Sequence, residues 1–163
     1  MTTENRLLDF KDAQDIRASL LAEGHSVKLK LGGNSMFPFL RAGDVGTVIR
    51  IPVEELKIGQ VVVFQNQERW IAHRLVDIKH NGNGDEKLFV TQGDSAKRTD
   101  AAFYQAHYLG VVVSFNRHGK HRQISLKLGA ISSKMLIHLR PVPQLIFHLF
   151  LRVRNRLNRG RNK

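Results

Sequence analysis

Three short segments of this chain carry side chains that could act together in nucleophilic catalysis. The first is a glycine-rich turn at 33–38, which can expose the hydroxyl of Ser35 and point backbone N–H groups at a developing oxyanion. The second holds His73 in an apolar stretch, and the third is a loop in which Asp94 and Asp100 stand six residues apart. Serine, histidine and aspartate can serve as nucleophile, general base and orienting carboxylate.

Each of these residues also has an ordinary structural interpretation. Serine in a glycine-rich loop is commonly a turn residue, and a lone histidine such as His73 is commonly a satisfied core or surface side chain. Loop carboxylates such as Asp94 usually form Asx turns or cap helices. Because sequence separation does not test geometry, both interpretations stay open at this level.

Composition excludes several other kinds of site. The 163 residues include no Cys, which excludes a disulfide scaffold, a Cys-ligated zinc site and a thiol nucleophile. His118 and His121 have a spacing that could suit a metal, but cationic residues flank them, so we expect a solvated basic loop there. No nucleotide-binding motif is present, and the sequence predicts no metal or other cofactor.

The elements around these residues predict a mainly β (α+β) protein. A helical stretch at 1–24 is expected to end at Gly24, and a compact, mostly antiparallel β-domain is expected at 25–125. Alternating or dense apolar segments separated by glycine-rich turns support this domain. A strong hairpin-loop signal lies at 81–84. The expected strands lie at 27–31, 45–51, 61–64, 70–78, 88–91 and 109–115.

The charge is concentrated at the C-terminal end. Residues 1–100 carry 14 Lys+Arg and 14 Asp+Glu, whereas residues 101–163 carry 12 Lys+Arg and no acid. The segment 126–163 predicts a basic amphipathic helical tail suited to an anionic membrane surface. A helix packed on the β-domain with a wet basic face is an equal alternative. The arginines that border the apolar face of the tail are Arg152, Arg154, Arg156 and Arg159.

The tail and the N-terminal end also bear on partners and location. Phe147 and Phe150 fall on the apolar face and are not interleaved with the arginines, which makes nucleic acid an unlikely partner. No apolar run of about 18 residues exists, so no ordinary transmembrane helix is expected. The N-terminal end has no apolar stretch typical of a signal peptide. The sequence therefore predicts a cytoplasmic or peripheral membrane protein.

Five segments, taken in order, resemble the boxes of the signal peptidase I family of serine peptidases. The serine box has the form Ser-Met-x-Pro…Gly-Asp, and the segment with His73 is similar to the His-Arg-Val segment of the endoplasmic-reticulum-type branch. The matching segments are Gly33-Asn34-Ser35-Met36-Phe37-Pro38 with Gly43-Asp44, Val61-Val62-Val63-Phe64 after Gly59, Ala72-His73-Arg74-Leu75-Val76, Thr91-Gln92-Gly93-Asp94 with Asp100, and Gly110-Val111.

This resemblance implies a serine endopeptidase with the β-rich fold that signal peptidases share with LexA-type repressors. It implies that Ser35 is the nucleophile, that His73 replaces the lysine base of the more familiar bacterial enzymes, and that Asp100 orients the imidazole. An unperturbed imidazole titrates near pH 6.5, so activity is expected at about pH 6–7. The implied substrate is a leader or signal peptide that adds to a sheet edge. The implied supporting residues are Asp94, Asn34 and Met36.

The N-terminal end departs from the family, because a charged helix stands where a transmembrane anchor usually precedes the serine box. Two alternatives are a LexA-like transcriptional regulator that cuts itself and a catalytically silent binding module. Residues 1–31 are too short for a helix-turn-helix domain with a linker, and no Ala-Gly bond precedes Ser35. Retention of the serine, the histidine and both aspartates disfavours a silent module.

Overall fold

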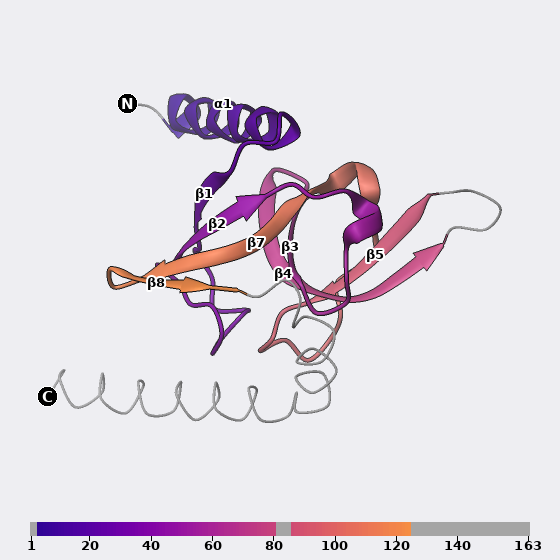
Figure 1. The fold of residues 1–163 in the computed structure, drawn as a ribbon. Helices are drawn as coiled ribbons and strands as arrows, with labels where there is room; N and C mark the ends of the chain where they lie inside the picture. The colour runs from indigo at the N-terminus through magenta and orange to yellow at the C-terminus, as the bar shows by residue number, and fades with distance from the viewer. Residues whose placement is uncertain (1–2, 81–85, 125–163) are drawn as a thin grey trace, which may run out of the picture.

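The computed structural model describes residues 3–80 and 86–124, which form one N-terminal helix and an antiparallel β-sheet (Figure 1). Helix α1, Thr3–Ala22, ends where glycine permits a left-handed backbone, since Gly24 has a φ of +86°. The N–H of His25 then donates to the carbonyl of Leu20 across 2.9 Å and closes the last turn. The predicted helix end at Gly24 is confirmed.

The described residues form one sheet of eight strands in the order β1-β2-β7-β3-β4-β5-β6, with β8 paired to β7. Two short 3-10 helices, Val53–Glu55 and Gln105–His107, connect strands. The fold is therefore mainly β, as the sequence predicted. The strands are β1 Val27–Lys30, β2 Val45–Ile49, β3 Val61–Asn66, β4 Arg69–His80, β5 Lys87–Gln92, β6 Phe103–Tyr104, β7 Tyr108–Arg117 and β8 Lys120–Gln123.

The long strand β4 changes partner halfway along its length. Its first half, from Arg69 to Arg74, pairs with β3, and its second half, from Arg74 to His80, pairs with β5. Among the described strands, the first half therefore keeps one edge without a partner strand, and β1 pairs only with β2. Among the described strands, the edges of β1 and of the first half of β4 are thus free, as are the outer edges of the short strands β6 and β8.

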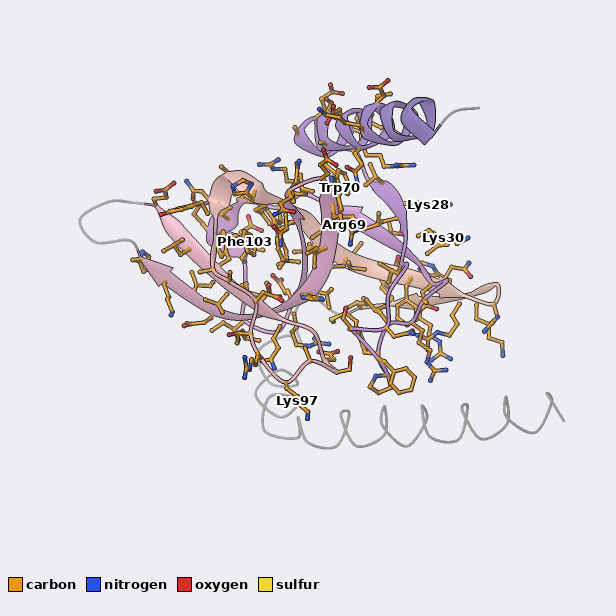
Figure 2. The ribbon with its side chains drawn as sticks, turned by 180° about the vertical axis from the view of Figure 1, so that it is seen from behind. Lys28, Lys30, Arg69, Trp70, Lys97 and Phe103 are labelled. Carbon is orange, nitrogen blue, oxygen red and sulfur yellow. The ribbon has the colours of Figure 1, made fainter. Side chains whose placement is uncertain are left out.

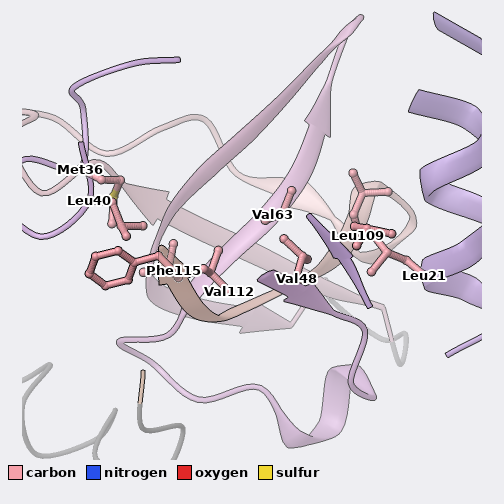
Figure 3. Packing of buried hydrophobic residues seen from close by; sticks show 10 residues of the cluster. Leu21, Met36, Leu40, Val48, Val63, Leu109, Val112 and Phe115 are labelled. Atoms are coloured by element: carbon pink, nitrogen blue, oxygen red, sulfur yellow. The ribbon is translucent and has the colours of Figure 1, made fainter. Parts of the chain in front are cut away.

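Two apolar clusters fill the interior. Figure 3 shows the cluster that extends from Leu21 of α1 to Met36 and Leu40, which follow Ser35, with Val48 between them. The second cluster lies around Phe64, Leu75, Phe89 and Phe103, and the rings of Phe64 and Phe103 stack with centroids 4.1 Å apart. The first cluster joins the helix, the sheet and the serine turn in one core.

Two strands differ from the sequence-based expectation. The sequence predicts a solvated basic loop at 118–121, but Lys120–Gln123 forms β8 and pairs with β7. The turn between them has positive φ at both His118 and Gly119, which matches the twist of a two-residue hairpin. All four β8 residues are exposed, so the strand carries no apolar alternation. The two-residue strand β6 was also missed.

Some predictions fall outside the described residues. These are the hairpin loop at 81–84, the helices of the 126–163 tail, and the membrane-surface candidates Arg152, Arg154, Arg156 and Arg159. Among residues 3–80 and 86–124, no helix combines the length and the apolar composition needed to cross a membrane.

Candidate active site

Ser35 lies in a turn that is anchored by residues buried in the apolar core. Met36 and Leu40 are 4% and 1% exposed, and both pack in the cluster that contains Leu21. Within the turn, the N–H of Phe37 donates to the carbonyl of Asn34 across 3.0 Å. Met36, predicted as a supporting residue, thus anchors the turn through burial, while Ser35 itself stays partly exposed.

The far end of the serine turn is fixed by an ion pair with β7. Arg117 Nε donates to Asp44 Oδ1 across 2.8 Å, and Arg117 Nη2 donates to Asp44 Oδ2 across 2.6 Å and to the carbonyl of Phe39 across 2.9 Å. Burial acts to raise the pKa of Asp44, but hydrogen bonds from Arg117 and the N–H of Arg41 outweigh it and lower that pKa below 3.8. Asp44 therefore stays ionised and holds the turn against the sheet.

His73 stands on β4 between Ser35 and Asp100. Its Nε2 lies 2.8 Å from Ser35 Oγ, and its Nδ1 lies 2.6 Å from Asp100 Oδ2. An ionised carboxylate only accepts hydrogen bonds, so Nδ1–H donates to Asp100 and Nε2 accepts from the Ser35 hydroxyl. The side chain of His73 is 13% exposed, and that of Asp100 is 29% exposed. The three residues that the sequence singled out are therefore hydrogen-bonded in series.

Asp100 is held in place by β5. The N–H of Asp100 donates to the carbonyl of Thr91 across 2.8 Å, and Thr91 Oγ1 donates to Asp100 Oδ2 across 2.7 Å. Burial acts to raise the pKa of Asp100, but the hydrogen bonds from His73 and Thr91 lower it below 3.8. The carboxylate is consequently ionised at neutral pH and can stabilise a positive charge on the imidazole.

The loop from 93 to 100 lies directly against the serine turn. A Cβ at Gly93 would lie 2.8 Å from the carbonyl oxygen of Ser35 and 3.3 Å from His73 Nε2, so only glycine fits there. The N–H of Ser95 donates to the carbonyl of Ser35 across 2.8 Å, and Ser95 Oγ lies 3.0 Å from the carbonyl oxygen of Asn34. The loop and the turn are thus locked together through Asn34 and Ser35.

Asp94 has a different role from Asp100, since its hydrogen bonds lead to Arg74 and not to His73. Arg74 Nε and Nη2 donate to the two carboxylate oxygens of Asp94, each across 2.7 Å, and Arg74 Nη1 donates to the carbonyl of Gly59 across 2.7 Å. The side chains of Arg74 and Asp94 are only 8% and 10% exposed. Because Arg74 directly follows His73, this pair fixes the loop relative to the histidine.

A cavity of about 300 Å³ opens beside Ser35 and His73. It lies between β1 with its extension to Gly33 and the first half of β4, and each of these strands has an edge without a partner strand in the described sheet. A Cβ added at Gly32 or Gly33 would meet no heavy atom of the described residues within 4 Å beyond its chain neighbours, which leaves the approach to Ser35 open. The apolar residues that line the cavity are Leu29, Leu31, Trp70, Ile71 and Ala72.

The backbone N–H of Ser35 is a further polar group of the site. Within the described residues, no group accepts a hydrogen bond from the backbone N–H of Ser35. An unpaired N–H on the nucleophile itself can stabilise negative charge on a carbonyl oxygen under attack. The site thus combines a hydroxyl, a hydrogen-bonded base with its carboxylate, and an available backbone donor.

The sequence pointed to Ser35, His73 and Asp100, but it did not single out Thr91 or Ser95. Thr91 stands in the box with Asp94, and that box was the one signal that could have nominated it. Ser95 lies 60 residues after Ser35, and only folding of the chain brings the two residues into contact. Among the described residues, no group of three or more His, Asp or Glu side chains is placed to hold a metal ion.

In sequence comparisons, the chain matches no protein-family model and no curated protein. The geometry of the site is therefore the basis on which a function can be argued.

Proposed function

We propose that this protein is a serine endopeptidase in which Ser35 is the nucleophile, His73 is the general base and Asp100 orients the imidazole. One observation carries the proposal: Ser35 Oγ, His73 and Asp100 form a series of two hydrogen bonds of 2.8 Å and 2.6 Å. Ser35 and His73 also line a cavity that lies between the free edges of β1 and the first half of β4. The resemblance of this site's residues to signal peptidase boxes supports the same function.

The first half of the reaction is acylation. Ser35 Oγ attacks the scissile carbonyl carbon while His73 Nε2 takes the hydroxyl proton, and Asp100 stabilises the imidazolium that forms. The N–H of Ser35 donates to the oxyanion of the tetrahedral intermediate. His73 Nε2 then gives its proton to the leaving amine, and the C–N bond breaks.

The second half of the reaction is hydrolysis of the acyl-enzyme. Water attacks the ester carbon while His73 Nε2 accepts a proton from the water. The same proton returns to Ser35 Oγ as the ester bond breaks, which releases the carboxylate product and restores the starting state. The hydrogen bond from Asp100 holds Nε2 toward Ser35 throughout both halves.

The substrate that fits this site is an extended peptide. β1 and the first half of β4 each leave backbone groups on an edge without a partner strand among the described residues, and an extended segment between them can pair with both. The walls beside Ser35 are formed by apolar side chains such as Leu31 and Ala72. A leader or signal peptide with small apolar residues near the scissile bond is the substrate that we propose.

The test compares cells that make the wild type, Ser35→Ala and His73→Ala. New protein N-termini are catalogued by mass spectrometry, in membrane and soluble fractions separately. We expect a set of N-termini that is present with the wild type and missing with both variants, because each variant breaks the series of hydrogen bonds at the nucleophile or the base.

Ser26→Ala and His25→Ala provide matched controls, since both residues are exposed and lie outside the hydrogen-bonded series. Circular dichroism and thermal unfolding of each purified variant establish that it folds. If the wild type is folded and abundant but yields the same N-termini as Ser35→Ala, the proposed peptidase activity is wrong.

A further inference from the structure

The cavity beside Ser35 continues into a second cavity of about 420 Å³ next to α1. The two cavities share Leu29, Lys30, Arg69 and Trp70, so they form one groove that runs along β1 and β4 away from Ser35. We call the second cavity the cationic pocket. It is lined by Gln14, Arg17, Lys28, Leu29, Lys30, Arg69 and Trp70.

Four of these seven lining residues are cations, and none is acidic. Arg17 comes from α1, Lys28 and Lys30 from β1, and Arg69 from the start of β4. Figure 2 shows Lys28 and Lys30 on β1, with Arg69 and Trp70 beside them below α1. Three separate elements thus bring positive charge to the same end of the groove.

These cations lack ionic partners among the side chains that the structure describes. None of the five ion pairs found there includes Arg17, Lys28, Lys30 or Arg69. Unpaired cations around a concave surface attract a ligand of opposite charge, and the low-dielectric walls strengthen that attraction. The pocket is therefore complementary to an anionic group.

We propose that the cationic pocket selects peptide substrates that carry acidic residues about four positions from the scissile bond. The inference rests on the proposed peptidase function, because the scissile bond is placed at Ser35 and at His73, whose Nε2 lies 2.8 Å from Ser35 Oγ. His73 lies four residue steps after Arg69 on β4, or about 13 Å at 3.3 Å per residue. An extended peptide that pairs with the edge of β4 covers that distance in the same number of residues.

A peptide fits these observations better than a nucleic acid. The pocket is continuous with a groove whose edges expose strand backbone, and that backbone pairs with another peptide strand. The groove walls beside Ser35 include Leu29, Leu31 and Ala72, which suit apolar side chains and not phosphates. The expected substrate thus has apolar residues near the scissile bond and Asp or Glu farther along.

Trp70 allows binding in this groove to be measured directly. It is the only Trp in the chain and lines both cavities, so its fluorescence reports a ligand at their junction. The full-length Ser35→Ala chain is titrated with decapeptides of Ala, Ser and Leu. These carry two Glu, or two Lys, at either the amino or the carboxyl end. A deoxythymidine oligonucleotide serves as the phosphate probe.

We expect one Glu peptide to change Trp70 fluorescence with a Kd at least tenfold lower than that of the matching Lys peptide. The preference should weaken with added salt, which screens exposed charges. The double variant Lys28→Glu/Arg69→Glu should lose the preference, whereas the control Lys79→Glu/Lys120→Glu, with the same change of charge at exposed sites outside both cavities, should keep it. The basic 126–163 tail is unchanged in both variants.

Equal affinity for Glu and Lys peptides, or no response of Trp70 to any peptide, would overturn the inference. Tighter binding of the oligonucleotide than of the Glu peptides would also overturn it and assign the pocket to nucleic acid. Cleavage is measured separately with the wild type on the same peptides. A chain that prefers Glu peptides but yields no cleaved product or new cellular N-terminus keeps the pocket and loses the peptidase.

Discussion

The two ends of the groove differ in whether their charged side chains have ionic partners. At the end next to Ser35, Asp100 accepts hydrogen bonds from His73 and Thr91, and Asp94 is bound to Arg74. At the end next to α1, the described part of the chain offers no carboxylate partner to any of the four cations of the cationic pocket.

This difference separates charges that fix geometry from charges that are available to a ligand. A nucleophile and a base must keep their relative position within a fraction of an ångström, and buried ion pairs with two or three hydrogen bonds restrict the loops that carry them. Exposed lysines and arginines fix little, but they can be neutralised by a bound anion. The charged side chains next to Ser35 are thus held by partners, whereas the cations next to α1 have no carboxylate partner among the described side chains.

The largest effect is expected from Asp100→Asn, at the end of the groove next to Ser35, which we call the paired end because its charged side chains have ionic partners. Asparagine no longer fixes the imidazole with its proton on Nδ1 or stabilises the imidazolium, so kcat/KM for peptide cleavage should fall about 10³–10⁴-fold. Steady-state cleavage of a substrate peptide measures the change. Asp77→Asn is the control, since Asp77 is a partly buried carboxylate on β4 outside this hydrogen-bonded series. Equal losses in the two variants would contradict an orienting role for Asp100.

Asp94→Ala should show how strongly an ion pair holds the paired end. It leaves the buried guanidinium of Arg74 without its carboxylate, which should lower the free energy of unfolding by about 3 kcal/mol. Urea unfolding measures this loss. Glu54→Gln, which removes a partner from the more exposed Lys87–Glu54 pair, should cost less than about 1 kcal/mol. If both variants lost the same amount, burial would not distinguish these pairs.

A third prediction concerns acid stability, through Asp44 and its bond to Arg117. The folded-state pKa of Asp44 lies below 3.8, so its contribution to stability is complete above pH 3.8 and is lost as pH falls through the folded pKa. Asp44→Asn should be about 2 kcal/mol less stable than the wild type at pH 6. Urea unfolding at pH 6 and pH 2.5 should show that gap narrowing in acid. A constant gap would contradict an ionised Asp44.

The smallest effect is expected at the unpaired end. Lys28→Glu/Arg69→Glu removes two exposed cations that have no ion pair among the described side chains, so the free energy of unfolding should change by less than about 0.5 kcal/mol. Thermal and urea unfolding of the variant beside the wild type measure this. A loss as large as that of Asp94→Ala would show that these cations stabilise the fold, and the contrast between the two ends would fail.

Local patterns in the sequence determined much of the fold. The end of α1 followed from Gly24, and the alternation of Val27 and Leu29 with Lys28 and Lys30 matches the burial of β1. Strand β8 could not be predicted in this way, because all four of its side chains are exposed and its partner β7 supplies the pairing. Local pattern thus identifies elements that bury a face, and it misses elements that another strand stabilises.

The candidate site also has a part that the sequence nominated and a part that only the structure shows. The types and spacing of Ser35, His73 and Asp100 were sufficient to nominate them, while their catalytic roles remain predictions. Residue type and position could not separate Asp94 from Asp100, since both are loop carboxylates, and only the resemblance gave the orienting role to Asp100. The structure shows their partners, which are Arg74 for Asp94 and His73 for Asp100.

The groove was beyond the reach of the sequence altogether. The groove exists because β4 pairs with β3 in its first half and with β5 only in its second half. The first half therefore has a free edge opposite β1, a strand about 40 residues earlier in the chain. Residue types decide what chemistry a side chain can perform, and they are written in the sequence. Distances between segments far apart in the chain depend on how the whole sheet pairs and packs, and only the tertiary structure determines them.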